Sequence, residues 1–142
     1  MIVSDINLLL YAVFDGFEQH ETARSWLTER LNSDEELGLP LPVVFGFIRL
    51  ATNRRVVTHP LTLDRAVGYI EEWLARPNTV PLLPGPRHLQ IAFALLRKLG
   101  SARDLTTDVQ LAALAIEHQA ELCSNDSDFG RFSGLRWTNP LT

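Results

Sequence analysis

The sequence contains almost no cysteine and no long hydrophobic run. Cys123 is the single cysteine among 142 residues, so the chain cannot close an internal disulfide. This is typical of a reducing compartment, and we expect a cytoplasmic protein. No apolar stretch approaches the roughly 20 residues that span a bilayer. The apolar opening segment has no basic residues and carries Asp5 in its middle, which argues against a signal peptide.

An excess of positive charge is also absent. Lys and Arg together number 13 against 17 Asp and Glu, which gives a formal net charge of −4. Proteins that hold nucleic acid mainly by electrostatic attraction are usually basic. A nucleic-acid partner would therefore need a local basic patch here, or metal ions that offset acidic side chains.

Repeats, low-complexity tracts and long linkers are missing as well. We therefore predict a single domain over residues 1–142, a usual domain length. A chain of this size buries about two thirds of its unfolded surface, so it needs no cross-link to hold a core.

Short strands alternate with helices along the chain. Hydrophobic patterns predict strands at residues 2–4, 37–39, 79–83, 121–124 and 135–137. They predict helices at residues 6–14, 18–32, 43–51, 62–74, 87–99 and 107–118, and a short helical turn at 125–129. Thr62 and Thr107 are the expected N-caps of two helices, and Gly100 the residue that ends another. This alternation predicts an α/β fold with a short, mostly parallel sheet and helices on both faces.

Acidic residues gather where strands end or helices begin. Asp5 follows the first predicted strand, and Asp126 follows the fourth after a single Asn. Asp108 lies at the start of a helix, and Asp128 comes two residues after Asp126. Because parallel α/β folds bind ligands at the carboxyl ends of their strands, we expect these carboxylates on one rim of the sheet.

Each aspartate alone has an ordinary explanation as a helix N-cap or first-turn residue. Their combination is harder to explain in this way, because two carboxylates about 4 Å apart repel by about 4 kcal/mol at an effective dielectric of 20. Such a cluster is tolerated if its members stay apart, take up protons or bind a cation. Oxygen ligands suit Mg²⁺, with Mn²⁺ as a possible substitute, and the ion would activate water for phosphodiester hydrolysis.

Three segments resemble motifs of PIN-domain toxins of the VapC group. They are residues 3–12 (VSDINLLLYA), 107–115 (TDVQLAALA) and 124–129 (SNDSDF). Residues 49–53 and 132–137 also look like this group, so the resemblance covers nearly the whole chain. It implies a PIN-like three-layer domain that acts as a metal-dependent endoribonuclease. It further implies the toxin of a type II toxin–antitoxin system, cutting structured RNA such as tRNA or rRNA.

The resemblance also implies roles for individual residues. Asp5 and Asp108 would be the main metal ligands, Asp126 would complete the catalytic set, and Asp128 would support it. Asn7 would orient the Asp5 end of the site. The implied partners are a second copy of the chain and a VapB-like antitoxin that inserts a segment into the active-site groove.

One position departs from the family pattern. Gly46 stands where the family usually carries a Glu on the third helix. Either a water replaces this carboxylate, or the site binds metal weakly, or the activity is impaired. The alternative function is therefore a catalytically weak or silent module that binds RNA or an antitoxin.

A basic cluster and the position of Asp5 after the first strand also bear on the function. Arg49, Arg54 and Arg55 form a basic cluster that could contact RNA phosphates, or else form salt bridges or a solvated surface. A phosphatase of the haloacid dehalogenase type also begins with an Asp after its first strand, but it needs a second Asp at the position of Asn7. That function is therefore disfavoured.

Overall fold

A five-stranded parallel sheet forms the centre of the computed structural model, which describes all 142 residues. Its strands are β1 (Ile2–Ser4), β2 (Leu37–Pro40), β3 (Thr79–Leu82), β4 (Glu121–Cys123) and β5 (Arg136–Thr138). They lie in the order β3-β2-β1-β4-β5, and every neighbouring pair is parallel. All five predicted strands are present, and the sheet is parallel throughout.

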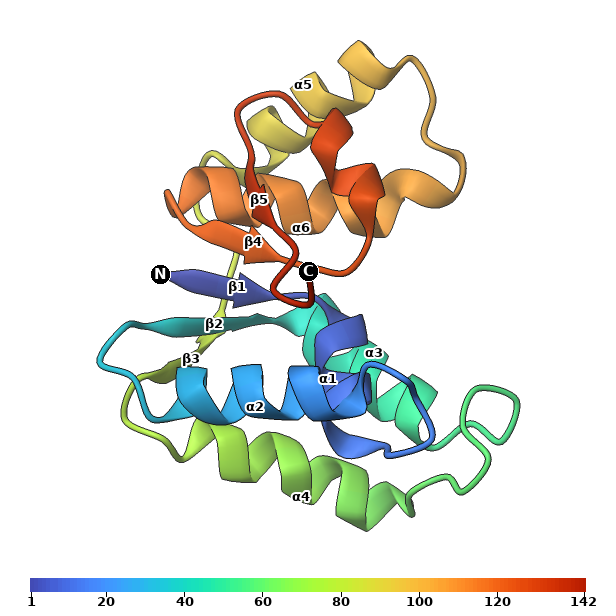
Figure 1. Ribbon diagram of the computed structural model, residues 1–142. Coiled ribbons are helices and arrows are strands. Elements are labelled where there is room, and N and C mark those ends of the chain that lie inside the picture. The colour runs from blue at the N-terminus through green and yellow to red at the C-terminus, as the bar shows by residue number, and fades with distance from the viewer.

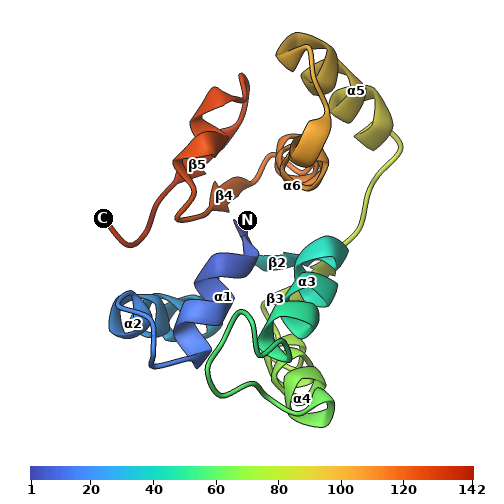
Figure 2. The same ribbon diagram turned by 90° about the vertical axis from the view of Figure 1, so that its right-hand side faces the viewer.

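Helices cover both faces of this sheet. They are α1 (Ile6–Val13), α2 (His20–Leu31), α3 (Leu41–Ala51), α4 (Leu63–Leu74), α5 (His88–Leu99) and α6 (Thr106–Glu117). Two 3₁₀ turns are added, η1 (Arg103–Leu105) and η2 (Ser127–Arg131). Helices α1 and α2 lie on one side of the sheet and α5 and α6 on the other, as the two views in Figures 1 and 2 show. The predicted three-layer α/β fold is therefore confirmed.

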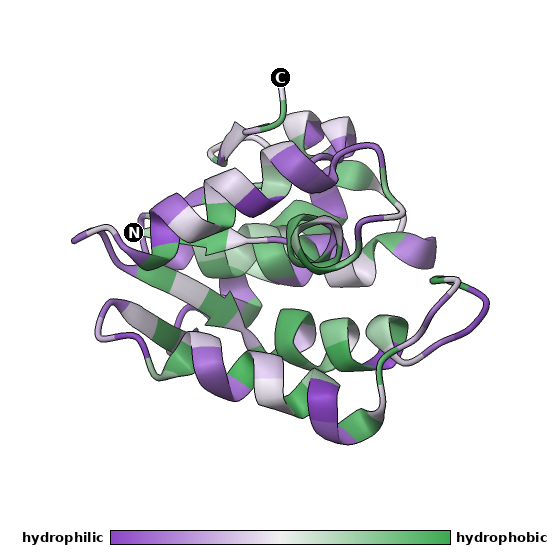
Figure 3. Cartoon of the chain, turned by 60° about the horizontal axis from the view of Figure 1, so that its bottom comes forward, coloured by the Kyte–Doolittle hydropathy of each residue, from purple (hydrophilic) through white to green (hydrophobic).

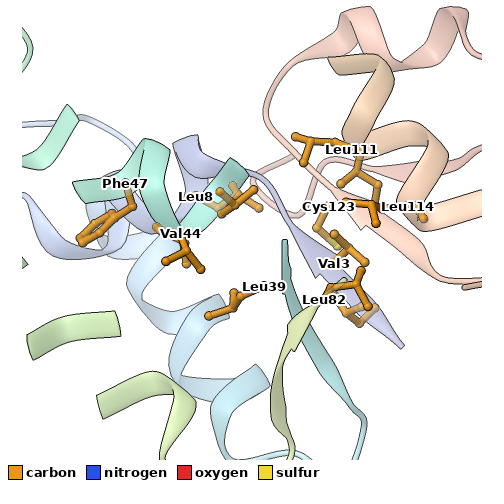
Figure 4. Packing of buried hydrophobic residues seen from close by; sticks show 14 of the residues in the cluster. Val3, Leu8, Leu39, Val44, Phe47, Leu82, Leu111, Leu114 and Cys123 are labelled. Atoms are coloured by element: carbon orange, nitrogen blue, oxygen red, sulfur yellow. The ribbon is translucent and has the colours of Figure 1, made fainter. Parts of the chain in front are cut away.

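The hydrophobic core follows from this layering. A single cluster of 31 buried residues fills the space between sheet and helices. Figure 4 shows Leu111 and Leu114 pointing from α6 toward the sheet, while Leu8 of α1 lies near Val44 of α3. Hydrophobic residues accordingly concentrate on the strands and on the inward faces of the helices, and hydrophilic residues on the loops (Figure 3).

Three helix boundaries differ from the prediction. Thr62 caps α4 by accepting a hydrogen bond from Arg65 N, and Gly100 adopts a left-handed φ of 74°, both as expected. Thr107, however, is not a cap: η1 runs directly into α6, so this residue lies inside the first turn and the cap position falls on Leu105. Helix α3 begins two residues before its predicted start because Pro42 fits the first helical turn, and α2 begins two residues later than predicted.

None of these helices combines the length and the apolar character that a membrane crossing requires.

Candidate active site

The carboxyl edge of the sheet brings distant segments together. Ser4 of β1 is paired in register with Cys123 of β4, so the residues that follow, Asp5 and Ser124, emerge side by side. Asp108 reaches the same region from the first turn of α6. Figure 2 is turned so that this edge faces the viewer. The topology thus places three predicted site segments at one rim.

Asp5 is held firmly at this rim. Only 9% of the residue is exposed, and it caps α1, with Oδ1 accepting a hydrogen bond of 2.7 Å from Ile6 N. Its Oδ2 accepts a hydrogen bond of 2.7 Å from the hydroxyl of Ser124. The side-chain amide of Asn7 also donates to Oδ2, at 3.4 Å, which is the contact that an orienting role of Asn7 requires.

Ser124 joins the candidate site through its contacts, although its place in the sequence does not mark it as a site residue. It is fully buried at the end of β4. Besides donating to Asp5, its Oγ accepts hydrogen bonds from Asp126 N at 3.0 Å and from the Asn7 amide at 3.3 Å. One hydroxyl thus joins the Asp5 and Asp126 segments. The only sequence signal was a small polar residue at the end of an apolar strand.

Electrostatic repulsion acts across the rim. Burial, followed by the nearby charges of Asp126, Asp5 and Asp128, raises the pKa of Asp108 to about 6. Burial also raises the pKa of Asp5, although the hydrogen bonds from Ser124 and Ile6 oppose this change. The aspartates predicted to share a rim therefore lie close enough to influence one another's ionisation.

Asp126 caps η2 and Asp128 lies within it, and the two carboxylates have different surroundings. Asp126 Oδ1 accepts a hydrogen bond of 2.9 Å from Asp128 N and so caps the turn. Asp128 is exposed and forms an ion pair with Arg131, in which Oδ1 lies 3.0 Å from Nη2. Asp128 thus already has a cationic partner, whereas Asp108 forms no ion pair within the chain.

The donor set fits a hydrated hard cation better than a fully protein-ligated one. No three acidic, histidine or cysteine side chains lie close enough together to surround an ion by themselves. Mg²⁺ usually takes one or two carboxylates and keeps several waters, so it does not need such a cage. Burial is the main cause of the raised pKa of Asp108, and the charges of three other carboxylates add to it, which a cation would offset.

The fold agrees with comparisons to known proteins. A family model for the PIN domain matches residues 2–135. The chain belongs to the PIN-domain family.

Relatives of this PIN domain are curated as ribonucleases of the VapC group. The chain is 54% identical over 141 residues to Ribonuclease VapC33 of Mycobacterium tuberculosis H37Rv, covering 99% of both chains. It is 39% identical over 140 residues to Ribonuclease VapC37 of the same strain, covering 99% of this chain and 97% of the relative. Both matches extend over nearly the full length, so the chain is a VapC-group PIN domain.

Solved structures share the fold at low sequence identity. VapBC-1 from nontypeable Haemophilus influenzae gives a TM-score of 0.69 at 18% identity, and all of both chains is covered. FitAB bound to an IR36 DNA fragment gives a TM-score of 0.68 at 16% identity, covering 100% of this chain and 96% of that one. These likenesses support the PIN fold.

In this PIN domain the position of the usual family Glu is closed by a neighbour. Gly46 is buried on α3, and a Cβ atom built on it would collide with Cδ1 of Ile6 and lie 3.2 Å from its Cγ1. Ile6 follows Asp5 directly and donates its backbone N–H to that carboxylate. Position 46 therefore lies against Ile6, the residue that follows Asp5. The Ile6 side chain occupies the space that a longer side chain at position 46 would enter.

The basic cluster of Arg49, Arg54 and Arg55 is free for an external partner. Arg49, Arg54 and Arg55 are all exposed, and none of them takes part in an ion pair within the chain. The alternative that intramolecular salt bridges account for this cluster is therefore wrong. Cys123 is a buried core residue as expected, and burial raises the pKa of its thiol to about 12.

Proposed function

We propose that this PIN domain is a metal-dependent endoribonuclease and the toxin of a type II toxin–antitoxin pair. The observation that carries the proposal is the rim itself, where Asp108 is raised in pKa by burial and by three other carboxylates. The names of the VapC relatives point to the same activity. The proposed substrate is structured RNA such as tRNA or rRNA.

Different residues of the site would bind the metal ion, orient its ligands and bind the RNA. Asp5 and Asp108 would hold Mg²⁺ or Mn²⁺ directly, with Asp126 acting through water and Asp128 at the margin. The bound ion would lower the pKa of a coordinated water and offset the charge that develops on the phosphate. Ser124 and Asn7 hold Asp5 in place by hydrogen bonds to Oδ2. Arg49, Arg54 and Arg55 would bind RNA phosphates outside the rim.

Metal-stimulated cleavage tests this function. We expect the purified protein to cut RNA with Mg²⁺ or Mn²⁺ and to stop on addition of EDTA. Asp5→Asn and Asp108→Asn should each lower the cleavage rate by at least about 100-fold, because even residues that only support metal ligands contribute 10- to 100-fold. Asp64→Asn, on the exposed start of α4, is the matched control and should cut normally. No cleavage by the wild type over a broad RNA panel would favour the silent binding module.

We also propose a VapB-like antitoxin as partner. The structural neighbours include toxin–antitoxin complexes, among them VapBC-1. A cleft of about 500 Å³ between α1, α2 and α4 is lined by apolar residues, by two arginines, Arg24 and Arg65, and by one acidic residue, Asp15. Such a lining suits a segment that carries both apolar and acidic side chains. Co-expression with the product of a short neighbouring reading frame, followed by co-purification, tests this partner.

A second copy of the chain is the other proposed partner. Large exposed apolar side chains concentrate on α3, on α5 and on the segment between β3 and α5, namely Leu41, Phe45, Leu83, Leu89 and Phe93. Leu41 and Phe45 line a cavity of about 280 Å³ together with His88, whose buried Nδ1 has no hydrogen-bond partner. Exposed apolar clusters of this kind mark association surfaces.

Removing one apolar side chain from this surface tests the dimer. Phe45→Ser should shift the protein from dimer to monomer in analytical ultracentrifugation. Leu63→Ser on α4 is the control, because Phe45 and Leu63 are both 66% exposed. A wild-type protein that sediments as a monomer at micromolar concentration would contradict the proposal.

A further inference from the structure

Arg131 is a cation held at the acidic rim. It is the last residue of η2, which follows β4. Its Nε donates a hydrogen bond of 3.1 Å to the backbone oxygen of Asp128, and its Nη2 lies 3.0 Å from Asp128 Oδ1. Nη1 makes no hydrogen bond within the protein, and 38% of the side chain remains exposed. The guanidinium is thus fixed at one end and free at the other.

Arg131 is linked to the proposed metal site by a chain of contacts. Its ion-pair partner Asp128 donates its N–H to Asp126 Oδ1, and the N–H of Asp126 donates to the Ser124 hydroxyl that binds Asp5. An RNA phosphate that approaches this rim would meet repulsion from four aspartates. Arg131 is therefore the protein cation best placed to offset that repulsion next to the metal ligands.

We propose that Arg131 binds an RNA phosphate beside the reacting one and that Asp128 serves to orient it. This inference rests on the proposed nuclease function and adds a substrate contact to it. Arginine forms paired hydrogen bonds to phosphate in a fixed geometry, and a guanidinium held in advance loses little freedom on binding. Asp128 is accordingly a positioning residue, since its carboxylate is already engaged by Arg131.

Substrate binding and metal binding should respond to Arg131 in opposite directions. Arg131→Gln should weaken the binding of a short single-stranded RNA by about 10-fold or more, measured by fluorescence anisotropy in EDTA so that nothing is cut. The slope of log affinity against log salt should fall by about 1, since one phosphate contact is lost. Mn²⁺ affinity, measured by calorimetry without RNA, should stay the same or increase, because a cation has left the rim. Arg131→Lys should lie between wild type and Arg131→Gln in RNA affinity.

Matched outcomes separate this role from others. Arg97→Gln, on the exposed face of α5 and outside every ion pair, should leave both affinities unchanged. If Arg131→Gln binds RNA like Arg97→Gln, Arg131 is not a phosphate contact. If it loses RNA binding, Mn²⁺ binding and thermal stability together, its role is to hold η2, and the inference is wrong. If the wild type itself neither binds Mn²⁺ nor cuts RNA, the proposed function fails instead.

Discussion

Single residues differ in how far the sequence alone indicates their role, as Asp5, Ser124 and Arg131 show. Asp5 was predictable because it follows a buried strand directly, and the same reasoning led to Asp126, whereas Asp108 was predicted from its place at the start of a helix. The contact between Asp5 and Ser124 spans 119 positions in sequence, so no local pattern could indicate it. Arg131 was missed because its effect depends on where η2 places its charge. Acidic residues at strand ends could be predicted from the sequence, whereas the hydrogen bonds that orient them could not.

Position 46 provides the sharpest residue-scale prediction. A side chain there must push aside the flexible end of the half-buried Ile6, so Gly46→Glu should lower stability by no more than about 1 kcal/mol, the lower end of the usual cost of overpacking. The double variant Ile6→Ala with Gly46→Glu removes the obstacle and adds a carboxylate beside Asp5. We expect this double variant to bind Mn²⁺ about 10-fold more tightly than Ile6→Ala alone, measured by calorimetry.

Gly46→Ala is the control for this pair. It meets the same Ile6 side chain without adding charge, so it should affect stability and not tighten metal binding. Equal Mn²⁺ affinity in the double variant and in Ile6→Ala would mean that position 46 does not face the rim.

Helix starts show where sequence reasoning succeeds and fails at the scale of elements. Thr62 could be identified as a cap because an extended segment precedes α4 and leaves its first N–H groups free. Thr107 looked equally suitable, but a 3₁₀ turn precedes α6 and moves the boundary. Arg103, the first residue of η1, has a positive φ of 38°. A non-glycine residue in this conformation is uncommon, so the sequence offered no warning.

The two threonines form a matched experiment. Thr62→Ala removes the hydrogen bond of 3.2 Å to Arg65 N and should lower the free energy of unfolding by about 1 kcal/mol. Thr107→Ala removes no hydrogen bond and replaces a β-branched residue inside a helix, so stability should stay the same or rise slightly. Urea denaturation followed by circular dichroism measures both. A comparable loss in Thr107→Ala would show that this side chain caps α6 after all.

For the whole molecule, topology decides both the fold and the place of the site. Alternating strands and helices were sufficient to predict the parallel sheet, because helical crossovers between adjacent strands leave few alternatives. The strand order was not predicted, and it is this order that makes β1 and β4 neighbours. The resulting rim concentrates negative charge, so folding without a cation includes a repulsive contribution.

This contribution predicts an unusual pH response of the metal-free protein. Because the pKa of Asp108 is raised to about 6 in the folded state, the folded protein takes up a proton before the unfolded chain does. Stability in EDTA should therefore increase as the pH falls from about 8 to about 5.5, with a melting temperature higher by a few degrees. Asp5 contributes in the same direction, since its pKa is also raised.

Asp108→Asn should be more stable than the wild type at about pH 8 in EDTA and should show a flatter pH response. Added Mg²⁺ should stabilise the wild type at that pH and have little effect on the variant. Differential scanning calorimetry provides both measurements. A wild type whose stability falls steadily over the same pH interval would refute the assignment of repulsion to this rim.

The hydroxyl of Ser124 has a fixed direction of hydrogen bonding in the site. Amide N–H groups from Asp126 and Asn7 occupy its oxygen as donors, so its own hydrogen is left for Asp5. Every group that forms a hydrogen bond with the Asp5 carboxylate is thus a donor, and none of them can accept a hydrogen bond in return. A proton on the side of either carboxylate oxygen that accepts these bonds would point at the hydrogen of a donor. The network therefore favours the anion and limits, without reversing, the increase in the pKa of Asp5 that burial causes.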